Sequence, residues 1–176
     1  MGHSMIDQLL TTGIDIKSNA FVLGDGSEIG CSIYDTNGTD RYKSLNETFY
    51  KKADGCLLVY DITNRRSFEQ IKDYYIPKIK EKCHKNIIIL LLGNKKDMKE
   101  MRKVSWEEGN ALALENNYIF KEASCIENEN VFDTFQNIIE NTFNKKKNNW
   151  NNDNDNISLI SNRHKNLNKV RKTKCC

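Results

Sequence analysis

The sequence predicts an α/β protein with a mostly parallel sheet that helices wrap on both sides. Two short apolar runs, residues 56–60 and 87–92, consist largely of leucine and β-branched side chains. Runs of this length and composition are typical of buried parallel strands. Segments with helical periodicity follow each run, and strands that alternate with helices indicate this fold class.

The first half of the chain predicts a hairpin, a strand and a helix. Residues 20–23 and 29–34 flank a Gly-Asp-Gly turn, which is typical of a β-hairpin. The apolar run over 56–60 predicts the first buried strand. A helix is expected over 67–83, bent or broken by Pro77, the only proline in the chain.

The second half repeats the alternation. After the strand over 87–92, the pattern predicts a helix over 105–116 and a strand over 118–121. The last helix is expected over 129–146. Its apolar residues between Val131 and Phe143 recur at i, i+4 and i+7 and therefore share one face.

Composition excludes several classes of protein. Hydrophobic content of 38% and charged content of 29% suit a soluble protein, and no run approaches the ~20 apolar residues of a membrane span. The net charge of +3 is too small to indicate nucleic-acid binding. Six cysteines in a chain without a secretory signal argue against a disulfide framework. Cys31, Cys56 and Cys83 fall in apolar patterns and are expected to be buried free thiols.

The strand over 87–92 ends in residues 93–97, Gly-Asn-Lys-Lys-Asp, which have the chemistry of a guanine-binding loop. Ligands of open α/β sheets sit beyond the carboxyl ends of such strands. There Asp97 can accept hydrogen bonds from the two donors on the guanine edge, the stem of Lys95 can cover the base, and Asn94 can tie neighbouring loops together. Adenine lacks both donors, so such a site rejects it. The alternative interpretation is a polar strand-to-helix loop.

Five segments together resemble the Ras superfamily and, within it, the Rab proteins. Residues 34–42 resemble the Rab motif Trp-Asp-Thr-Ala-Gly-Gln-Glu-Arg-Phe, and residues 49–55 resemble Tyr-Tyr-Arg-Gly-Ala-x-Gly. Residues 59–63, 93–97 and 122–124 match further motifs in the same order and at the same distances. The resemblance covers about residues 11–144.

The resemblance implies a Ras-like P-loop GTPase fold, a mostly parallel sheet wrapped by helices, with the first strand, P-loop and first helix missing. It divides the chain into a Rab-like GTPase domain over 1–146, truncated at its N-terminus, and a tail over 147–176. The implied cofactors are GTP or GDP and Mg²⁺.

The family's site residues carry over to matching positions. Asp35 is expected to hold a water on the magnesium ion, and the backbone amide of Gly38 to meet the γ-phosphate. Thr11 matches the switch threonine that binds magnesium. Ser124 and the amide of Cys125 are expected to contact guanine beside Asn94, Lys95 and Asp97.

Two features of the family pattern are altered at the catalytic and partner positions. Thr39 replaces the glutamine that orients the attacking water, so hydrolysis by the chain alone is expected to be slow. A partner's arginine can restore roughly 10³–10⁵ in rate. The partner-contacting aromatic positions correspond to Ile16, Tyr34 and Phe49, of which Ile16 is not aromatic; a role in the core is the alternative for all three.

The chain contains no Gly-x-x-x-x-Gly-Lys-Ser/Thr phosphate loop, and the glycine-rich residues 24–31 include no lysine. Losing roughly four charge-assisted bonds removes on the order of 6–12 kcal/mol, or about four to eight powers of ten in nucleotide affinity. The family's first strand lies between the strands over 29–34 and 56–60, so an empty slot is expected there. We expect a sequence truncated upstream; the alternative is a pseudo-GTPase.

The tail over 147–176 is asparagine-rich, then basic, and is expected to be a disordered tether. Its last residues, Cys175 and Cys176, resemble the double geranylgeranylation signal of Rab proteins, and two lipids give stable anchoring. A chance cysteine pair or a metal ligand is the alternative.

The expected function is a Rab-like GTP/GDP switch of vesicle trafficking on the cytosolic face of an intracellular membrane. Its expected partners are effectors, exchange factors, GTPase-activating proteins, a prenylation escort and a GDP-dissociation carrier, and no nucleic acid. The alternative is a prenylated interaction protein with no nucleotide cycle.

Overall fold

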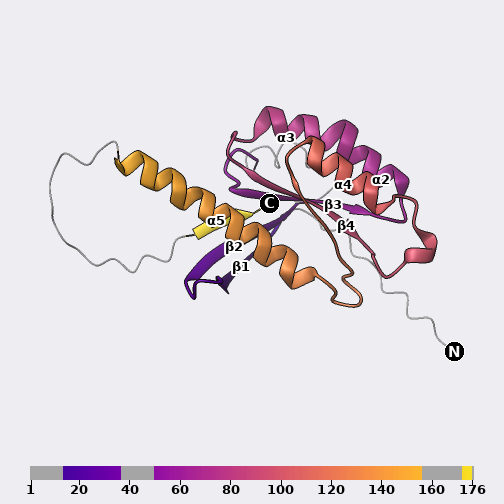
Figure 1. The fold of residues 1–176 in the computed structure, drawn as a ribbon, viewed down its shortest axis with the longest axis horizontal. Coiled ribbons are helices and arrows are strands. Elements are labelled where there is room, and N and C mark those ends of the chain that lie inside the picture. The colour runs from indigo at the N-terminus through magenta and orange to yellow at the C-terminus, as the bar shows by residue number, and fades with distance from the viewer. Residues whose placement is uncertain (1–13, 37–49, 156–171, 176) are drawn as a thin grey trace.

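A single sheet lies between helices on both faces in the computed structural model, which describes residues 14–36, 50–155 and 172–175. Helices α2, α3 and α4 cover one face, and the long helix α5 crosses the other (Figure 1). The predicted α/β class is confirmed. Strands β3, β4 and β5 pair in parallel, and β5 lies at one edge of the sheet.

The elements have the following bounds. The strands are β1 Ile14–Val22, β2 Glu28–Thr36, β3 Gly55–Asp61, β4 Ile88–Asn94, β5 Ile119–Glu122 and β6 Lys172–Cys175. The helices are α2 Arg65–Gln70, the π-helix η2 Ile71–Tyr75, α3 Ile76–Lys82, the 3₁₀ turn η3 Lys99–Met101, α4 Trp106–Glu115 and α5 Val131–Asp155.

The strand order is β1-β2-β6-β3-β4-β5. The predicted hairpin is confirmed, since β1 and β2 pair antiparallel and Ile14 faces Thr36. The slot between β2 and β3, expected to be empty, is partly filled by β6. The backbone of β6 pairs in parallel with Gly30–Ile33 and reaches the first residue of β3, Gly55. Unpaired strand edges recruit extended backbone, which is the physical reason for this pairing.

The slot remains open beyond the end of β6. There a cavity of about 570 Å³ lies between β2 and β3. Its walls are apolar side chains of the two strands, such as Ile33 and Leu57, with Ile71 on one side of the sheet and Ile138 on the other. Near the carboxyl ends of the strands, Asp35 and Asn94 also line it.

The helix predicted over 67–83 consists of three consecutive pieces. Helix α2 is capped by Asn64, whose side chain accepts from the Ser67 N–H, and it passes into the π-helix η2. Pro77 is the second residue of α3, which follows η2 without an interruption. The predicted bend or break at Pro77 takes the form of a π-helical turn that ends two residues before the proline.

The two later helices differ in how well the sequence marks their ends. Ser105 and Glu108 form a reciprocal capping box at the start of α4, close to the predicted start. Helix α5 ends at Asp155, although the prediction ended it at residue 146. Residues 147–155 continue α5, and residues 172–175 form β6. The disordered tether expected over 147–176 stays a prediction.

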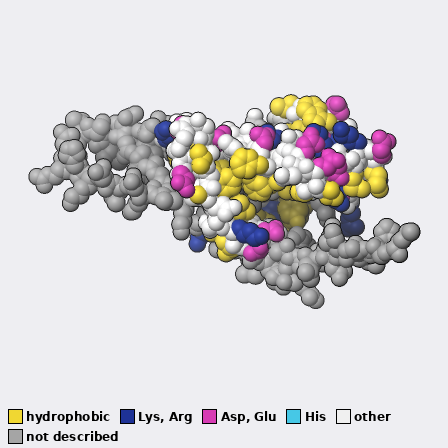
Figure 2. Space-filling model, turned by 90° about the horizontal axis from the view of Figure 1, so that it is seen from below, with side chains coloured by type: hydrophobic (Ala, Val, Ile, Leu, Met, Phe, Trp, Pro, Cys, Tyr) yellow, Lys and Arg dark blue, Asp and Glu magenta, His cyan; other side chains and the backbone are white. Residues whose placement is uncertain are grey.

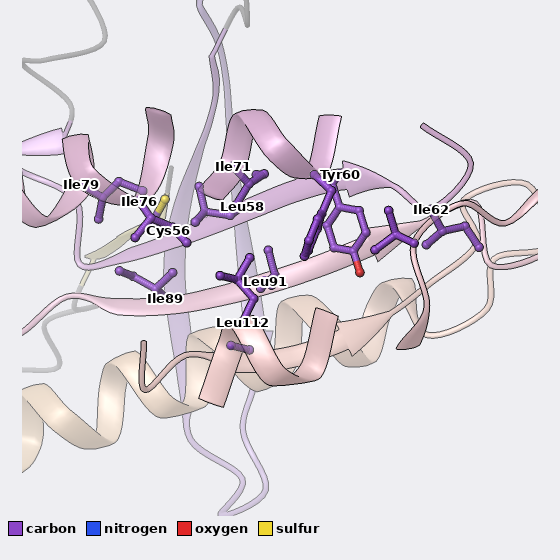
Figure 3. Packing of buried hydrophobic residues seen from close by; sticks show 13 residues of the cluster. Cys56, Leu58, Tyr60, Ile62, Ile71, Ile76, Ile79, Ile89, Leu91 and Leu112 are labelled. Atoms are coloured by element: carbon purple, nitrogen blue, oxygen red, sulfur yellow. The ribbon is translucent and has the colours of Figure 1, made fainter. Parts of the chain in front are cut away.

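The core has one cluster on each face of the sheet. Figure 3 shows Leu58, Ile71, Leu91 and Leu112 converging between the strands and the helices of one face. Ile138 and Ile139 of α5 cover the opposite face. Hydrophobic side chains reach the surface between charged groups on the face that Figure 2 shows. Val59 and Phe132 are among the exposed hydrophobic residues of the described part. The predicted burial is confirmed for Cys31 and Cys56, whereas Cys83 is half-buried.

Gly109 of α4 is the position where the core tolerates no side chain. A Cβ atom there would lie 2.4 Å from the Tyr60 hydroxyl oxygen and 2.6 Å from the Phe120 ring. We expect Gly109→Ala to lower the free energy of unfolding by about 1–2 kcal/mol, because overpacking outweighs the gain in helix propensity. Urea unfolding measures this. Gly24→Ala is the control, since its Cβ would meet nothing closer than 3.9 Å; equal stability of the two variants would contradict the packing argument.

Candidate functional site

The carboxyl ends of β3, β4 and β5 meet at one edge of the sheet, and the predicted guanine-binding residues lie there. The register sets Asp61 beside Asn94 and Gly93 beside Glu122. Gly93 leaves little room for a side chain, because a Cβ would lie 3.0 Å from the Tyr60 hydroxyl oxygen and 3.1 Å from the Ile62 side chain. The backbone of β4 therefore packs closely over these two residues.

Backbone bonds join the loop after β4 to the loop after β5. The Ala123 N–H donates to the Gly93 carbonyl over 2.9 Å, and the Lys96 N–H donates to the Ala123 carbonyl over 3.0 Å. Two loops that are distant in sequence thus form one rigid unit. This unit brings together the predicted residues of 93–97 and 122–125.

Asp97 is held by Ser124. The Ser124 hydroxyl is fully buried and donates to the Asp97 carboxylate over 2.5 Å, and the same hydroxyl accepts from the Glu127 N–H over 3.1 Å. The half-buried Asp97 carboxylate keeps acceptor capacity beyond this bond. The arrangement fixes an acceptor for two ligand donors, which is the chemistry expected of a guanine-binding carboxylate.

Lys95 has a strained backbone and a salt bridge to β3. Its φ of 67° lies in the left-handed region, which few lysines occupy. Its ammonium group lies 2.7 Å from the Asp61 carboxylate. Burial acts to raise the pKa of Asp61, but hydrogen bonds from Lys95 and Thr63 prevail and hold that pKa below its usual range. The lysine stem is therefore directed along the strand ends.

Asn94 contacts its neighbours through the backbone. Its carbonyl accepts from the Ile62 N–H over 3.1 Å. The side-chain oxygen of Asn94 is buried and has no hydrogen-bond partner among the described residues. A buried acceptor left unpaired costs about 1–3 kcal/mol, so its presence indicates a place where a ligand or another segment supplies a donor.

Arg102 and Glu122 support the site from behind. The guanidinium group donates to both oxygens of the nearly buried Glu122 carboxylate, over 2.6 and 2.8 Å, and to the Val104 carbonyl over 3.0 Å. The hydrogen bond to Glu122 raises the pKa of Arg102. This bidentate pair fixes the segment after Asp97 to the end of β5.

The other predicted residues are distributed as follows. Asp35 is exposed near the end of β2 and lines the cavity between β2 and β3 together with Tyr34 and Cys125. Ile16 is 54% exposed on β1, and Tyr34 is half-buried. Thr11, Gly38, Thr39, Phe49 and Cys176 lie outside the described residues. The roles assigned to all of them stay predictions.

The magnesium ligands are not assembled by the described residues alone. Within 14–36, 50–155 and 172–175, no group of three or more histidine, cysteine, aspartate or glutamate side chains could hold a metal ion.

The same part of the chain has no helix that is both long and apolar enough to cross a bilayer.

Comparison with known proteins agrees with this geometry. The sequence matches the family model described as "Ras family" over residues 5–144. The chain belongs to the Ras family. That match includes β1 to β5 and most of the described part of α5, so the Ras-like fold expected from the motifs is confirmed.

The relatives of this Ras-family chain carry Rab and Ypt names. It is 37% identical to the GTP-binding protein ypt3 of Schizosaccharomyces pombe, over 78% of the chain and 64% of that protein. It is 41% identical to the Ras-related protein Rab-8B of Bos taurus, over 71% of the chain and 59% of that protein. The chain thus spans about three fifths of the length of these curated relatives. Both relatives are thus named as GTP-binding or Ras-related proteins, in line with the Ras-family match.

Two groups at the site are not apparent from the sequence motifs. Asp61 lies within the motif over 59–63, which assigns it no role; its place at the end of the strand beside β4 is the signal that identifies it as the partner of Lys95. The Lys96 ammonium group forms a salt bridge of 2.6 Å with Glu129, which lies just before α5. No local sequence pattern predicts this pair.

The salt bridge between Asp61 and Lys95 predicts a specific pH dependence. Because the native pKa of Asp61 is lowered, its stabilisation is present above the unfolded pKa and is lost as pH falls through the native pKa. We expect thermal unfolding of Asp61→Asn to vary less with acidification than that of the native chain. Lys95→Met should have the same effect, and the exposed Asp73→Asn should not; identical acid profiles of native chain and Asp61→Asn would contradict the assignment.

Proposed function

We propose that this Rab-type chain acts as a GTP/GDP switch in intracellular vesicle trafficking. The observation that carries the proposal is the Asp97 carboxylate held by the buried Ser124 hydroxyl at the carboxyl edge of the parallel sheet. A carboxylate fixed in this way can accept the N1–H and the 2-amino group of guanine together. Adenine presents neither donor, so the site would leave Asp97 unpaired with an adenine nucleotide.

Three neighbouring groups are suited to the rest of the base. The aliphatic stem of Lys95 can cover its flat face while the ammonium group keeps its bond to Asp61. The amide N–H of the exposed Cys125 can approach from the other loop. The buried side chain of Asn94 lies at the junction with the cavity, where an added donor would relieve its unpaired oxygen.

Few of the described residues are candidate ligands for the phosphates and Mg²⁺. Asp35 is the described residue that we propose to act on Mg²⁺ through a water, and Thr11 and Gly38 are the proposed partners outside the described part. Bound Mg²⁺ neutralises charge on the transferring phosphate. Because Thr39 is shorter than glutamine, we expect slow turnover without a GTPase-activating protein.

The proposed cycle needs the usual partners of the family. Effectors would recognise the GTP form, exchange factors would reload the site, and a GDP-dissociation carrier would extract the GDP form from the cytosolic face of a membrane. The proposed partner surface includes Ile16, Tyr34 and Phe49. Exposed Ile16, at 54%, is compatible with such a contact.

Base selectivity tests the switch proposal directly. We expect GDP, and not ADP, to shift NMR resonances of residues 94–97 and 124–125. Asp97→Asn should lose this preference and favour xanthosine diphosphate, because an amide can donate to the carbonyl that xanthine carries in place of the 2-amino group. We expect the preference for GDP over ADP to be about tenfold or more for each buried donor or acceptor that ADP leaves without a partner.

The control for the selectivity experiment is Asp73→Asn, which makes the same chemical change on the exposed side of η2. It should keep the preference for GDP. Equal response of the native chain to GDP and ADP would refute the guanine site. Absence of both responses in a version that includes a phosphate loop would favour the interaction protein without a nucleotide cycle.

We further propose that Cys175 and Cys176 carry geranylgeranyl groups. The backbone of Cys175, in β6, pairs with that of Ile33 in β2. The tail therefore has to leave the sheet before a lipid transferase can bind it. This release breaks only the pairings of a four-residue strand.

Mass spectrometry after incubation with a geranylgeranyl donor and transferase tests the lipid proposal. We expect two added groups on the native chain and one on Cys176→Ser, with membrane binding strongly reduced because one chain anchors marginally. The double variant Cys175→Ser/Cys176→Ser should carry none. Modification of the double variant at Cys125, the exposed cysteine of the site, would contradict the assignment.

A further inference from the structure

A second cavity lies at the opposite end of the sheet from Asp97. It has a volume of about 460 Å³ and lies where α3 ends and β4 and β5 begin, with the later part of α5 as its outer wall. In Figure 1 the end of α3 and the later part of α5 lie toward the left of the molecule. None of the residues 93–97 or 122–125 lines this cavity.

Three lysines from three separate segments surround it, and we call it the lysine pocket. Lys80 belongs to α3, Lys85 to the loop before β4, and Lys145 to α5. None of the three has an ion-pair partner among the described residues, and no described aspartate or glutamate lines the pocket. The neighbouring acid Asp54 is already bonded to Lys146 over 2.6 Å. The positive charge in the pocket is therefore uncompensated.

The floor of the lysine pocket is apolar and contains one buried donor. Isoleucines such as Ile87 and Ile119 line it, and the Tyr118 hydroxyl among them is buried without a hydrogen-bond partner in the described part of the chain. Burial also raises the pKa of the Tyr118 hydroxyl, which keeps its proton available for donation. A buried hydroxyl without a partner is costly, and Tyr118 lines the same cavity as the three lysines, which points to a ligand oxygen.

The side groups around the pocket are held in place. His84 bonds the Ala53 carbonyl through Nε2 over 2.7 Å, and the Asn116 amide donates to the Leu112 carbonyl over 2.8 Å. Burial raises the pKa of the Cys83 thiol to about 11, so Cys83 adds no negative charge at neutral pH. The pocket thus combines fixed walls with two exposed lysines, Lys80 and Lys85, and the half-buried Lys145, which suits a compact anion with several acceptor oxygens.

We propose that the lysine pocket binds a phosphate monoester, with the headgroup of an acidic membrane lipid as its source. Lysine ammonium groups are common phosphate ligands, and the Tyr118 hydroxyl would donate to the innermost oxygen. The apolar floor would contact the start of the lipid chains. The choice of a lipid source rests on the proposed function, because a chain anchored beyond α5 would turn this end of the sheet toward the bilayer.

Vesicle flotation of the unlipidated full chain tests the proposal. We expect binding to phosphatidylcholine vesicles that contain phosphatidic acid and no binding to phosphatidylcholine alone. Each lysine near an anionic surface contributes about a factor of five, so Lys80→Gln/Lys85→Gln/Lys145→Gln should bind about a hundredfold more weakly. The charge-matched control Lys72→Gln/Lys99→Gln/Lys103→Gln changes exposed lysines elsewhere and should bind like the native chain.

Tyr118→Phe separates a pocket from a merely basic surface. It removes the hydroxyl oxygen alone, so unfolding by urea should show no loss of stability. Vesicle binding should fall about fivefold or more, because one hydrogen bond to the anion is lost. An equal loss in the control lysine variant, or native-like binding by both Tyr118→Phe and the pocket lysine variant, would overturn the proposal.

Inorganic phosphate identifies the source. NMR shifts at Tyr118 and His84 with inorganic phosphate, in the absence of vesicle binding, would assign the site to a soluble phosphate and still support the phosphate chemistry. Failure of both probes would overturn it. The GDP and ADP titration on the same sample is independent: loss of guanine preference with intact phosphate binding would refute only the guanine-site and switch proposal.

Discussion

The pairing of β3 with β4 is the constraint on which the other features depend. These buried strands run in parallel from the pair Gly55 and Ile88 to the pair Asp61 and Asn94. A shift by one residue would turn Leu58 and Leu91 away from their cluster, so packing fixes the register. The same register determines which polar groups emerge together at either end of the sheet. It sets Asp61 within reach of Lys95 at one end and opens the lysine pocket at the other.

Unfavourable features of the fold concentrate at the carboxyl edge of this strand pair. Lys95 has a left-handed backbone, and neither the buried Asn94 side-chain oxygen nor the Tyr60 hydroxyl has a hydrogen-bond partner among the described residues. The bidentate contact of Arg102 with Glu122 and the capped start of α4 stabilise the same region. Strain that persists beside strong local support is common where a protein binds a ligand. This clustering supports a binding site independently of the family match.

Local patterns in the sequence predicted the elements that depend on local chemistry. The apolar runs identified β3 and β4, the Gly-Asp-Gly turn identified the hairpin, and Ser105 marked the start of α4. They could not predict β6, because its Lys-Thr-Lys-Cys sequence has no strand pattern and its partner β2 is distant in the chain. They also gave no sign of the buried Tyr118 hydroxyl or of three lysines from three segments meeting at one cavity, since tertiary packing alone brings those groups together.

The hairpin depends on α5 more than on strand pairing for its attachment to the rest of the sheet. Within the described part of the chain, the short β6 is the one segment that supplies backbone bonds between β2 and β3, and beyond it lies the apolar cavity. One face of α5 packs at once against Ile29 and Cys31 of the hairpin and Leu90 and Leu92 of β4. Because these apolar contacts bridge the slot, the two parts of the sheet can stay together while β6 leaves. The fold therefore permits release of the tail without exposing the core that positions Asp97.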